Sequence, residues 1–398
     1  MATVGQHTLA QLTNALTGRM PPALVVDAAL RHSPLVEGVR TAVGSASPVI
    51  TRPHWASLDD ARALLATLGT AATVVAVGGG SVLDCVKLAL ALEDGGTCAA
   101  ITLPQRGGWV YAPGAPRRRR LIALPTTLGT GSEVSTVVSF VHRGGKRALT
   151  SPTLPADATV LDAACTAGLS RSQVLQGAME ALLRAAGPYV GDHVERPQQD
   201  AAALGLVRDI ATLVAQIGSG SAADDWTRLA LARLSQRAHH EDLLAGRRPF
   251  ATTWWFVAND TAHVLRVPKM TALLWVLPRI WARMPARPAF GSAAHRDRVW
   301  ATVREVIPVA LPDEPAEGCT ALVRWLGLPL LPSPTHEQAH DIARSCVRLW
   351  GGGLPMLANL PYAVLLDLLT TEPHPSQAAA AAGPTAPRRP VAVGIPAH

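Results

Sequence analysis

The sequence predicts a two-part fold, with an α/β nucleotide-binding domain first and an all-helical domain after it. In the first part, short runs of small and β-branched residues alternate with amphipathic stretches, which is typical of a parallel sheet covered by helices. Beyond Ser170, apolar residues recur at helical spacing and no further strand run competes with them. We therefore expect domains over 1–165 and 166–373, followed by a mobile Ala/Pro-rich tail over 374–398.

The amino-acid composition excludes several classes of protein. Apolar residues make up 48% of the chain and charged residues only 16%, which excludes general disorder. The sequence has no run of eighteen apolar residues and no basic segment followed by an apolar core at its start, so we expect neither a membrane span nor a signal peptide. The five cysteines are scattered singly, as free thiols in a reducing cytoplasm would be.

The net charge of +7 raises the question of a nucleic-acid partner. Much of the excess is local, in the run Arg117 to Arg120, and aromatic residues for base stacking are not interleaved with it. We therefore expect no nucleic acid. The arginine run is interpreted as a solvated loop, with contact to an acidic peptide or a phosphate as the alternative.

The first predicted elements form the start of the sheet. Residues 22–27 and 48–51 read as strands, and 57–68 reads as a helix that begins at Ser57 or Asp59. The first of these strands ends in a carboxylate, Asp27, which can cap a following helix.

Residues 73–87 combine a buried strand, three glycines and the start of a helix. The strand 73–77 breaks at Gly78, Gly79 and Gly80, and a helix over 81–92 follows, with Ser81 and Asp84 in its first turns. Free N–H groups and the positive end of a helix dipole suit a phosphate, and glycine lets that phosphate approach the backbone closely. The alternative is a tight turn of the kind found in any α/β protein.

A second strand, 121–124, leads into a loop of hydroxyls and glycines. Thr126, Thr127 and Thr130 can hydrogen-bond a ribose, a phosphate or a nicotinamide amide. The segment before this strand, 94–120, reads as irregular. Residues 135–142 and 147–151 read as short extended pieces, and 158–161 as a strand. The helices predicted after them cover 171–186, 197–217, 222–244, 251–264, 270–284, 294–308, 335–349 and 358–371.

The ordered pair of motifs resembles the iron-containing (group III) alcohol dehydrogenase family. The motifs are Gly-Gly-Gly-Ser-x-x-Asp-x-x-Lys at 78–87 and Pro-Thr-Thr-x-Gly-Thr-Gly-Ser-Glu-Val at 125–134. The resemblance extends from about residue 23 to 369. It implies a dehydroquinate synthase-like fold with the active site between an α/β and a helical domain, an oxidoreductase acting on CH–OH, and a homo-oligomer such as a dimer.

The resemblance also implies cofactor contacts from both motifs, through Gly78 to Ser81, Asp84 and the three threonines. In the family an aspartate at the position of Asp27 lies near the adenosine ribose, which favours NAD over NADP. Lys146 stands where the family places a cofactor-contacting lysine. The alternatives are a helix cap at Asp27, a helix-dipole partner at Asp84 and a surface lysine at Lys146.

The family's metal ligands, one Asp and three His, do not occur at the matching positions. An ungapped match places Glu180 and Arg184 at the first two and Lys269 at the last, and counting back fourteen residues places Trp255 at the third. Arginine cannot donate a lone pair to a metal. Asn259 occupies the position of a further family histidine. A local shift would bring His263 close, but one imidazole with Glu180 makes a poor site, so we expect no metal.

Two interpretations of these substitutions remain. In one, the enzyme has decayed to a cofactor-binding protein that acts through a partner, and Glu180 and Arg184 form a helix-surface salt bridge. In the other, Arg184 and Lys269 face one cavity, where they bind an anionic substrate or stabilise an alkoxide. Lys269 with a lowered pKa would then be the general base. His239 and His240, at a predicted helix end, are interpreted as surface residues.

The second interpretation suggests a β-hydroxy carboxylate as substrate. Arg184 would hold the carboxylate, Lys269 or His263 would take the hydroxyl proton, and NAD would take the hydride. The chain is similar in this respect to maleylacetate reductases and to the dehydrogenases of daptide-type peptide biosynthesis, which act on a C-terminal threonine of a ribosomal peptide. We expect that oxidative decarboxylation first, with a biosynthetic partner protein as a further possibility. A maleylacetate reductase-like enzyme and a conventional alcohol dehydrogenase are the alternatives.

Overall fold

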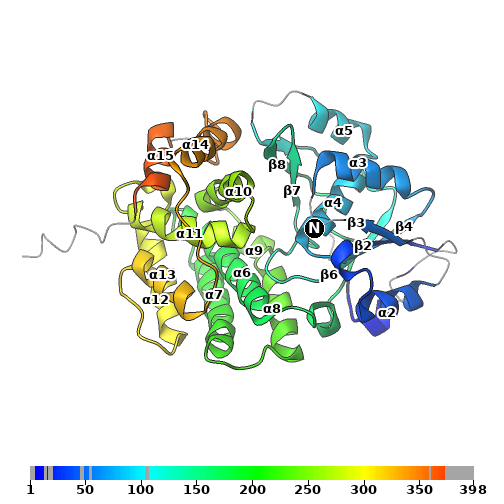
Figure 1. The fold of residues 1–398 in the computed structure, drawn as a ribbon, viewed down its shortest axis with the longest axis horizontal. Coiled ribbons are helices and arrows are strands. Elements are labelled where there is room, and N and C mark those ends of the chain that lie inside the picture. Colours follow the sequence, from blue (N-terminus) through cyan, green and yellow to red (C-terminus); the bar gives the residue numbers. More distant parts are fainter. Residues whose placement is uncertain are drawn as a thin grey trace, which may run out of the picture.

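A computed structural model describes residues 5–12, 16, 21–44, 49–52, 56–103, 107–357 and 360–372. Strands gather in the N-terminal half of the chain and helices in the C-terminal half, and the two halves lie side by side (Figure 1). This confirms the predicted fold class. The tail predicted over 374–398 lies outside the described residues.

The N-terminal half is built on a parallel six-stranded sheet. Its strand order is β1-β9-β6-β4-β2-β3, and every neighbouring pair is parallel. The strands are β1 (Gly5–His7), β2 (Ala23–Asp27), β3 (Val49–Arg52), β4 (Thr73–Gly78), β6 (Arg120–Pro125) and β9 (Ala158–Val160). The last five correspond to predicted strands, whereas β1 was not predicted, because three residues are too few to establish an alternating pattern.

Helices cover both faces of this sheet because side chains alternate along each strand. Leu24 and Val26 of β2 pack with α2 (Pro34–Val43). Ala23 and Val25 point to the other face and share a core with α3 (Leu58–Thr67) and α4 (Gly80–Ala91). The sheet is therefore an interior layer, as near-continuous apolar strands predict.

The segment 94–120, expected to be irregular, contains α5 (Gly95–Thr102) and β5 (Trp109–Tyr111). Asp94 caps α5, which is too short to show a clear apolar face. The arginine run is also not a solvated loop: Arg117 pairs with Asp157 at 2.7 Å, and Arg119 pairs with Glu93 at 2.6 Å. These ion pairs tie the entry of β6 to the rest of the domain.

The C-terminal half consists of helices around the largest apolar core. They are α6 (Arg171–Gly191), α7 (Pro197–Gly218), α8 (Asp225–Arg237), α9 (Glu241–Leu244), α10 (Thr253–Leu265), α11 (Lys269–Arg283), α12 (Ala293–Val306), α13 (Pro315–Trp325), α14 (His336–Trp350) and α15 (Tyr362–Thr370). Short 3₁₀ turns are η1 (Leu9–Gln11), η2 (Ala28–Leu30), η3 (Ala163–Thr166) and η4 (Pro288–Phe290). The helix predicted over 222–244 is divided into α8 and α9, and α13 was not predicted.

Within the described residues, α7 is the one helix long and apolar enough to cross a membrane by length and composition. Half of its apolar window is buried inside the structure, where it packs on α6 and α12. The core helices of globular domains meet the same criteria.

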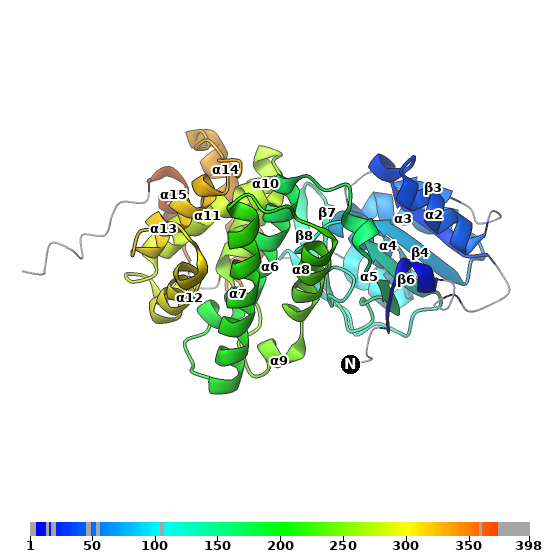
Figure 2. The same ribbon diagram turned by 90° about the horizontal axis from the view of Figure 1, so that it is seen from below.

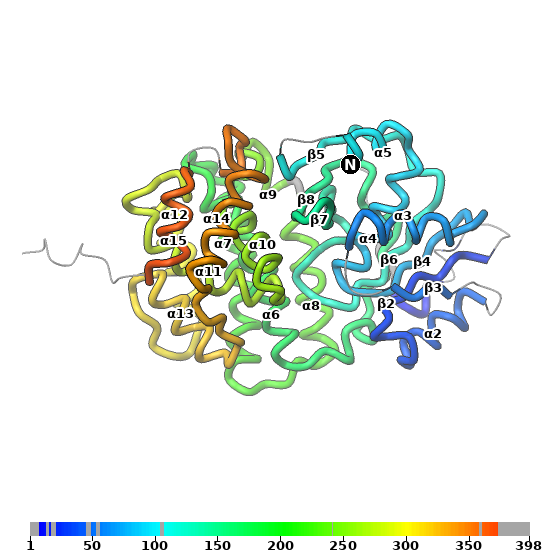
Figure 3. The backbone as a smooth tube through the Cα atoms, turned by 45° about the horizontal axis from the view of Figure 1, so that its top comes forward, coloured from blue at the N-terminus to red at the C-terminus, as the bar shows by residue number. Residues whose placement is uncertain are grey.

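A small second sheet joins the two halves. β7 (Val137–His142) pairs antiparallel with β8 (Gly145–Thr150), which pairs with β5. Figure 2 shows this hairpin between the α/β half and the helices, and β7 contacts α4 while β8 contacts α10 and α14. The tube in Figure 3 shows the same arrangement from another side. Residues of β8 therefore face both halves.

Candidate active site

The phosphate-binding turn lies where the direction of the sheet reverses. β2 has β3 on one side and β4 on the other, so Asp27 and Gly78 end neighbouring parallel strands. Ligands of open α/β sheets bind at such a reversal, outside the carboxyl ends of the strands. Gly79, the N-cap residue of α4, makes no side-chain cap hydrogen bond, and a helix N-terminus of this kind can bind an anion. The exposed Ser81 lies in that first turn.

The glycines of this turn are needed because the threonine loop packs directly on them. A Cβ at Gly79 would lie 2.9 Å from Thr127 Cγ2, and one at Gly80 would lie 2.8 Å from Thr130 Cγ2. The Gly80 N–H donates to Thr127 Oγ1 at 3.3 Å. The N–H of the buried Thr126 donates to the Gly78 carbonyl at 3.0 Å. The two predicted cofactor motifs therefore form one surface.

Two charged groups of α4 hold the threonine loop in place. The Asp84 carboxylate accepts hydrogen bonds from Ser132 Oγ at 2.5 Å and from the Ser139 N–H at 3.0 Å. The buried Lys87 ammonium donates to the carbonyls of Ser132 and Ser135, and burial lowers the pKa of Lys87 to about 8. Asp84 was predicted to contact the cofactor, but its carboxylate oxygens face the loop, so it acts on the cofactor site through that loop.

Asp27 caps η2: its Oδ1 accepts a hydrogen bond from the Ala29 N–H at 3.0 Å. This is the helix-cap role given above as the alternative. The cap also fixes the carboxylate beside the glycine turn, at the end of the adjacent strand.

The threonine loop also contacts the helical domain through its glycines. Gly129, with a φ of +89°, lies so close to α6 that a Cβ there would be 2.3 Å from the Gly177 carbonyl and 2.7 Å from Glu180 Cβ. Only glycine combines that backbone conformation with so close an approach. The cofactor loop is thereby placed directly over the helix turn that carries Glu180.

The four residues that the sequence match placed at metal-ligand positions meet at this point. Glu180 Oε1 accepts hydrogen bonds from both Arg184 Nη2, at 3.1 Å, and Lys269 Nζ, at 2.5 Å. Both cations also lie over the Trp255 ring, with Arg184 Cζ at 4.8 Å and Lys269 Nζ at 5.3 Å from its centroid. Burial raises the pKa of Glu180, but Lys269 and Arg184 together bring it below its usual value.

These side chains do not fit a divalent metal. Ammonium and guanidinium groups offer no lone pair, indole is not a ligand, and the contacted oxygen of Glu180 is already occupied by two cations. Across the described ranges of the chain, no group of three or more His, Cys, Asp or Glu side chains is arranged to hold one. The arrangement instead offers fixed positive charge beside an aromatic face.

Three other predicted site residues, Lys146, Asn259 and His263, have different surroundings. The half-buried Lys146 on β8 has its pKa lowered by burial and by Lys269, which places a third cation nearby. Asn259 is half-buried one turn after Trp255. The ring of His263 makes a 3.3 Å hydrogen bond to the Gly144 carbonyl, so it points to the β7–β8 turn.

His239 was predicted to be a surface residue, and that prediction was wrong. Its ring lies against Gly131 of the threonine loop, where a Cβ would fall 2.2 Å from His239 Cδ2. Its Nε2 is shielded from solvent and has no hydrogen-bond partner among the described residues. Burial, with Arg184 and Lys87, holds the pKa of His239 well below its usual value, so the imidazole is neutral.

The sequence could not distinguish His239 from His240, which is exposed and lies 3.1 Å from Asp242. Both follow the last turn of α8, and only the packing of α8 on the threonine loop separates them. The Gln236 side chain, one turn earlier, donates to the buried Glu133 of that loop at 3.1 Å.

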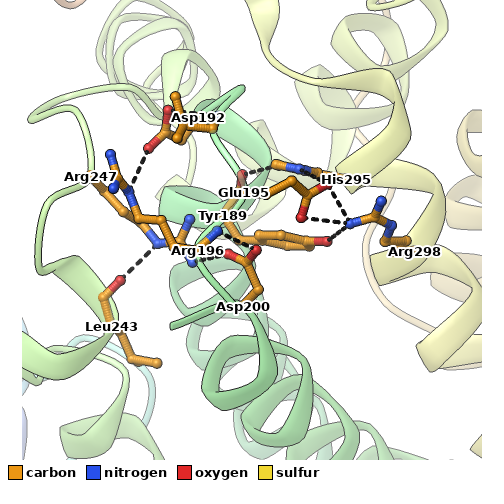
Figure 4. Close-up of polar contacts among 10 residues, drawn as sticks. Tyr189, Asp192, Glu195, Arg196, Asp200, Leu243, Arg247, His295 and Arg298 are labelled. Atoms are coloured by element: carbon orange, nitrogen blue, oxygen red, sulfur yellow. Dashed lines mark hydrogen bonds and ion pairs between the residues drawn. The ribbon is translucent and has the colours of Figure 1, made fainter. Parts of the chain in front are cut away.

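A second polar network braces the far end of α6 (Figure 4). The fully buried Tyr189 stacks on His295 with ring centroids 4.2 Å apart, and Arg247 lies over its ring at 5.5 Å. Arg247 pairs with Asp200 at 2.7 Å, and Arg298 donates to the Tyr189 hydroxyl at 3.1 Å. These contacts link α6 to α7 and α12 and fix the helix that carries Glu180 and Arg184.

Comparison with known proteins agrees with this architecture. A profile described as iron-containing alcohol dehydrogenase matches residues 2–163, the domain that holds both cofactor motifs. The N-terminal domain of this chain belongs to the iron-containing alcohol dehydrogenase family.

Two curated relatives are about one-third identical in sequence to this chain over the aligned regions. Phosphonoacetaldehyde reductase of Streptomyces viridochromogenes is 34% identical over 193 residues, which are 46% of this chain and 49% of the relative. The probable alcohol dehydrogenase EutG of Salmonella typhimurium is 34% identical over 161 residues, 39% of this chain and 38% of the relative. The chain thus spans half or less of the length of these relatives.

Solved structures of the family share the fold over nearly the whole chain. NADH-dependent butanol dehydrogenase A of Thermotoga maritima superposes with a TM-score of 0.74 at 16% identity, over 92% of this chain and 96% of that one. An iron-containing alcohol dehydrogenase of Thermococcus thioreducens gives a TM-score of 0.70 at 17% identity, over 92% and 97% of the two chains.

Proposed function

We propose that this protein is an NAD-dependent alcohol dehydrogenase that acts, without a metal, on a hydroxy substrate bearing a carboxylate. The observation that carries the proposal is the meeting of Arg184 and Lys269 on Glu180 and Trp255, directly beneath the cofactor loop. Fixed charges in such a position can stabilise a developing alkoxide and can orient an anion.

The cofactor half of the proposal is supported by the glycine turn at the sheet reversal and by the threonines packed on it. Asp27 at the end of β2 favours a free ribose hydroxyl over a 2′-phosphate, and therefore NAD over NADP. The bound cofactor would supply the hydride acceptor. Gly79, Gly80, Thr127 and Thr130 would hold its phosphates and orient its ring.

The proposal of an anionic substrate is supported by the positively charged side chains near Glu180. Arg184 and Lys269 share the one carboxylate of Glu180, and Lys146 lies near Lys269, which leaves positive charge for an anionic substrate. The guanidinium of Arg184 can hold a carboxylate bidentately. The relative from Streptomyces viridochromogenes acts, by its name, on a phosphonate, which is also an anion.

The hydroxyl proton needs an acceptor. Lys269 Nζ donates a hydrogen bond to Glu180, so we assign it the role of a donor to the developing alkoxide and not that of the base. His263 points to the β7–β8 turn. His239 is neutral and lies close enough to Arg184 and Lys269 for both cations to lower its pKa, so it is our candidate for the proton acceptor.

Within this class we favour a β-hydroxy acid, and specifically the C-terminal threonine of a ribosomal peptide, as in daptide-type biosynthesis. Transfer of the hydride from the carbinol carbon gives a β-keto acid. Its C–C bond to the carboxylate then breaks to release carbon dioxide, and the hydroxyl proton finally resides on the α-carbon of the ketone. Homodimerisation, a biosynthetic partner protein and a cytoplasmic location are part of the same proposal.

The direct test is incubation with NAD and a threonine-ending peptide. We expect NADH formation together with loss of carbon dioxide and two hydrogens from the peptide. The matched control is the same peptide with its C-terminus amidated, which removes the carboxylate and should not react. Equal turnover of both peptides would overturn the carboxylate requirement.

A second candidate function is a cofactor-binding protein without turnover. The Glu180–Arg184 ion pair at i and i+4 favours it, because simple decay would leave such a pair. Binding of NADH without oxidation of hydroxy acids, together with affinity for a biosynthetic partner, would select this candidate. Activity on simple primary alcohols, or on maleylacetate, would select the small-molecule alternatives.

A further inference from the structure

Two histidines lie close together on the first two turns of α14, outside the candidate active site. His336 and His340 stand four residues apart and therefore on one face of the helix. Their Nε2 atoms lie 2.9 Å apart, and the planes of the two rings are inclined by 80°. His336 is exposed and His340 is half-buried, so the pair is open to solvent on one side.

The contact with Tyr362 at the start of α15 orients the ring of His340. His340 Nδ1 lies within hydrogen-bonding distance of the Tyr362 hydroxyl. With Nδ1–H donating to that oxygen, Nε2 keeps its lone pair and faces His336. Metal-binding histidines are commonly oriented in this way, by a hydrogen bond from the ring nitrogen that does not face the metal.

We propose that His336 and His340 form a binding site for a late first-row divalent cation, nickel(II) or copper(II). A cation bound to imidazole nitrogens at 2.0–2.1 Å, with the two bonds at a right angle, requires those nitrogens to be about 2.9 Å apart. That is the separation of the two Nε2 atoms. Right-angled coordination is typical of tetragonal copper(II) and nickel(II), whereas a tetrahedral ion needs a wider pair of about 3.3 Å.

Water completes the coordination in this proposal, since among the described residues no third His, Cys, Asp or Glu joins the pair. The site belongs to α14, and none of the residues at the family's metal positions lies on that helix. In the metal-free protein, one imidazole donates a hydrogen bond to the other. Binding requires His336 to move its proton from Nε2 to the solvent-facing Nδ1.

The test is calorimetric titration of the untagged full chain with nickel chloride. We expect one saturable site per chain that is lost in both His336→Ala and His340→Ala. The matched control is His240→Ala, which removes an exposed histidine elsewhere and should leave the site unchanged. A thermal midpoint that rises with nickel in wild type but not in His340→Ala would confirm that the folded pair binds the ion.

Electron paramagnetic resonance of the copper(II) complex supplies the second readout. We expect hyperfine structure from two imidazole nitrogens in wild type and from one in His336→Gln. Tyr362→Phe should weaken binding by about tenfold through the lost hydrogen bond. Saturable binding that persists in the double variant His336→Ala/His340→Ala, or no saturable binding to wild type, would overturn the site.

Discussion

Lys269 Nζ lies 2.5 Å from Glu180 Oε1, although Lys269 begins α11 and Glu180 is in the middle of α6. Arg184 contacts the same oxygen from the next turn of α6. One buried carboxylate thus holds two cations from two different helices.

Replacing Glu180 with glutamine should lower the free energy of unfolding by about 3 kcal/mol, because a neutral amide leaves two cations without their partly buried counter-ion. Urea denaturation measures the change. The matched control is Glu37→Gln, which breaks an exposed ion pair with Arg40 and should cost less than about 1 kcal/mol. Equal losses in the two variants would show that the shared carboxylate has no special role.

Substitutions of Arg184 and of Lys269 should affect different kinetic parameters. Arg184→Lys keeps the charge but loses the bidentate fork, so KM for a carboxylate substrate should rise about tenfold with a smaller change in kcat. Lys269→Met removes a donor to the alkoxide, so kcat should fall about 100-fold. Steady-state NADH formation measures both. NADH affinity should remain at the wild-type level, and a parallel loss of cofactor binding would contradict these roles.

Gly131→Ala should disturb the site through His239. The new Cβ would fall 2.2 Å from His239 Cδ2, and the φ of +52° adds backbone strain. We expect a stability loss of about 3 kcal/mol and a loss of activity. Gly144→Ala controls for strain alone, since its φ is +66° and nothing lies within 4 Å of the new Cβ. In Gly131→Ala/His239→Ala, stability should be partly restored while activity is not, and strict additivity would contradict the contact.

Asp260 should make stability depend on pH. Burial raises its pKa to about 6, although Ser345 Oγ, Trp350 Nε1 and Cys346 Sγ donate to its oxygens. The folded state therefore holds this proton more tightly than the unfolded chain. The resulting stability is fully present below about pH 4 and is lost as the pH rises through about 6.

A pKa change from 3.8 to about 6 corresponds to about 3 kcal/mol. Relative to Asp260→Asn, the unfolding free energy of wild type should fall by about that amount between pH 4 and pH 7. Urea denaturation across this range measures the difference, and Asp59→Asn, at an exposed position, controls for the change in net charge. Parallel profiles for wild type and Asp260→Asn would contradict the prediction.

Much of the cofactor site could be predicted because short, continuous stretches of the sequence form it. Three glycines between a strand and a helix, and hydroxyls after the next strand, describe a phosphate-binding edge whatever lies around them. Ungapped spacing also located Glu180, Arg184, Trp255 and Lys269. Those stretches were enough to predict the fold class, and the absence of a metal remains a prediction.

Contacts between distant segments could be decided only by the tertiary structure. Two neighbouring histidines have the same local pattern, yet packing on Gly131 buries the Nε2 of His239 and leaves His240 exposed. Likewise, the sequence predicted that Arg184 and Lys269 face one cavity, but only the tertiary packing brings both cations onto the same oxygen of Glu180. The sequence determines the chemistry of each side chain. Its charge state and its hydrogen-bond and ion-pair partners depend on the packing that excludes water around it.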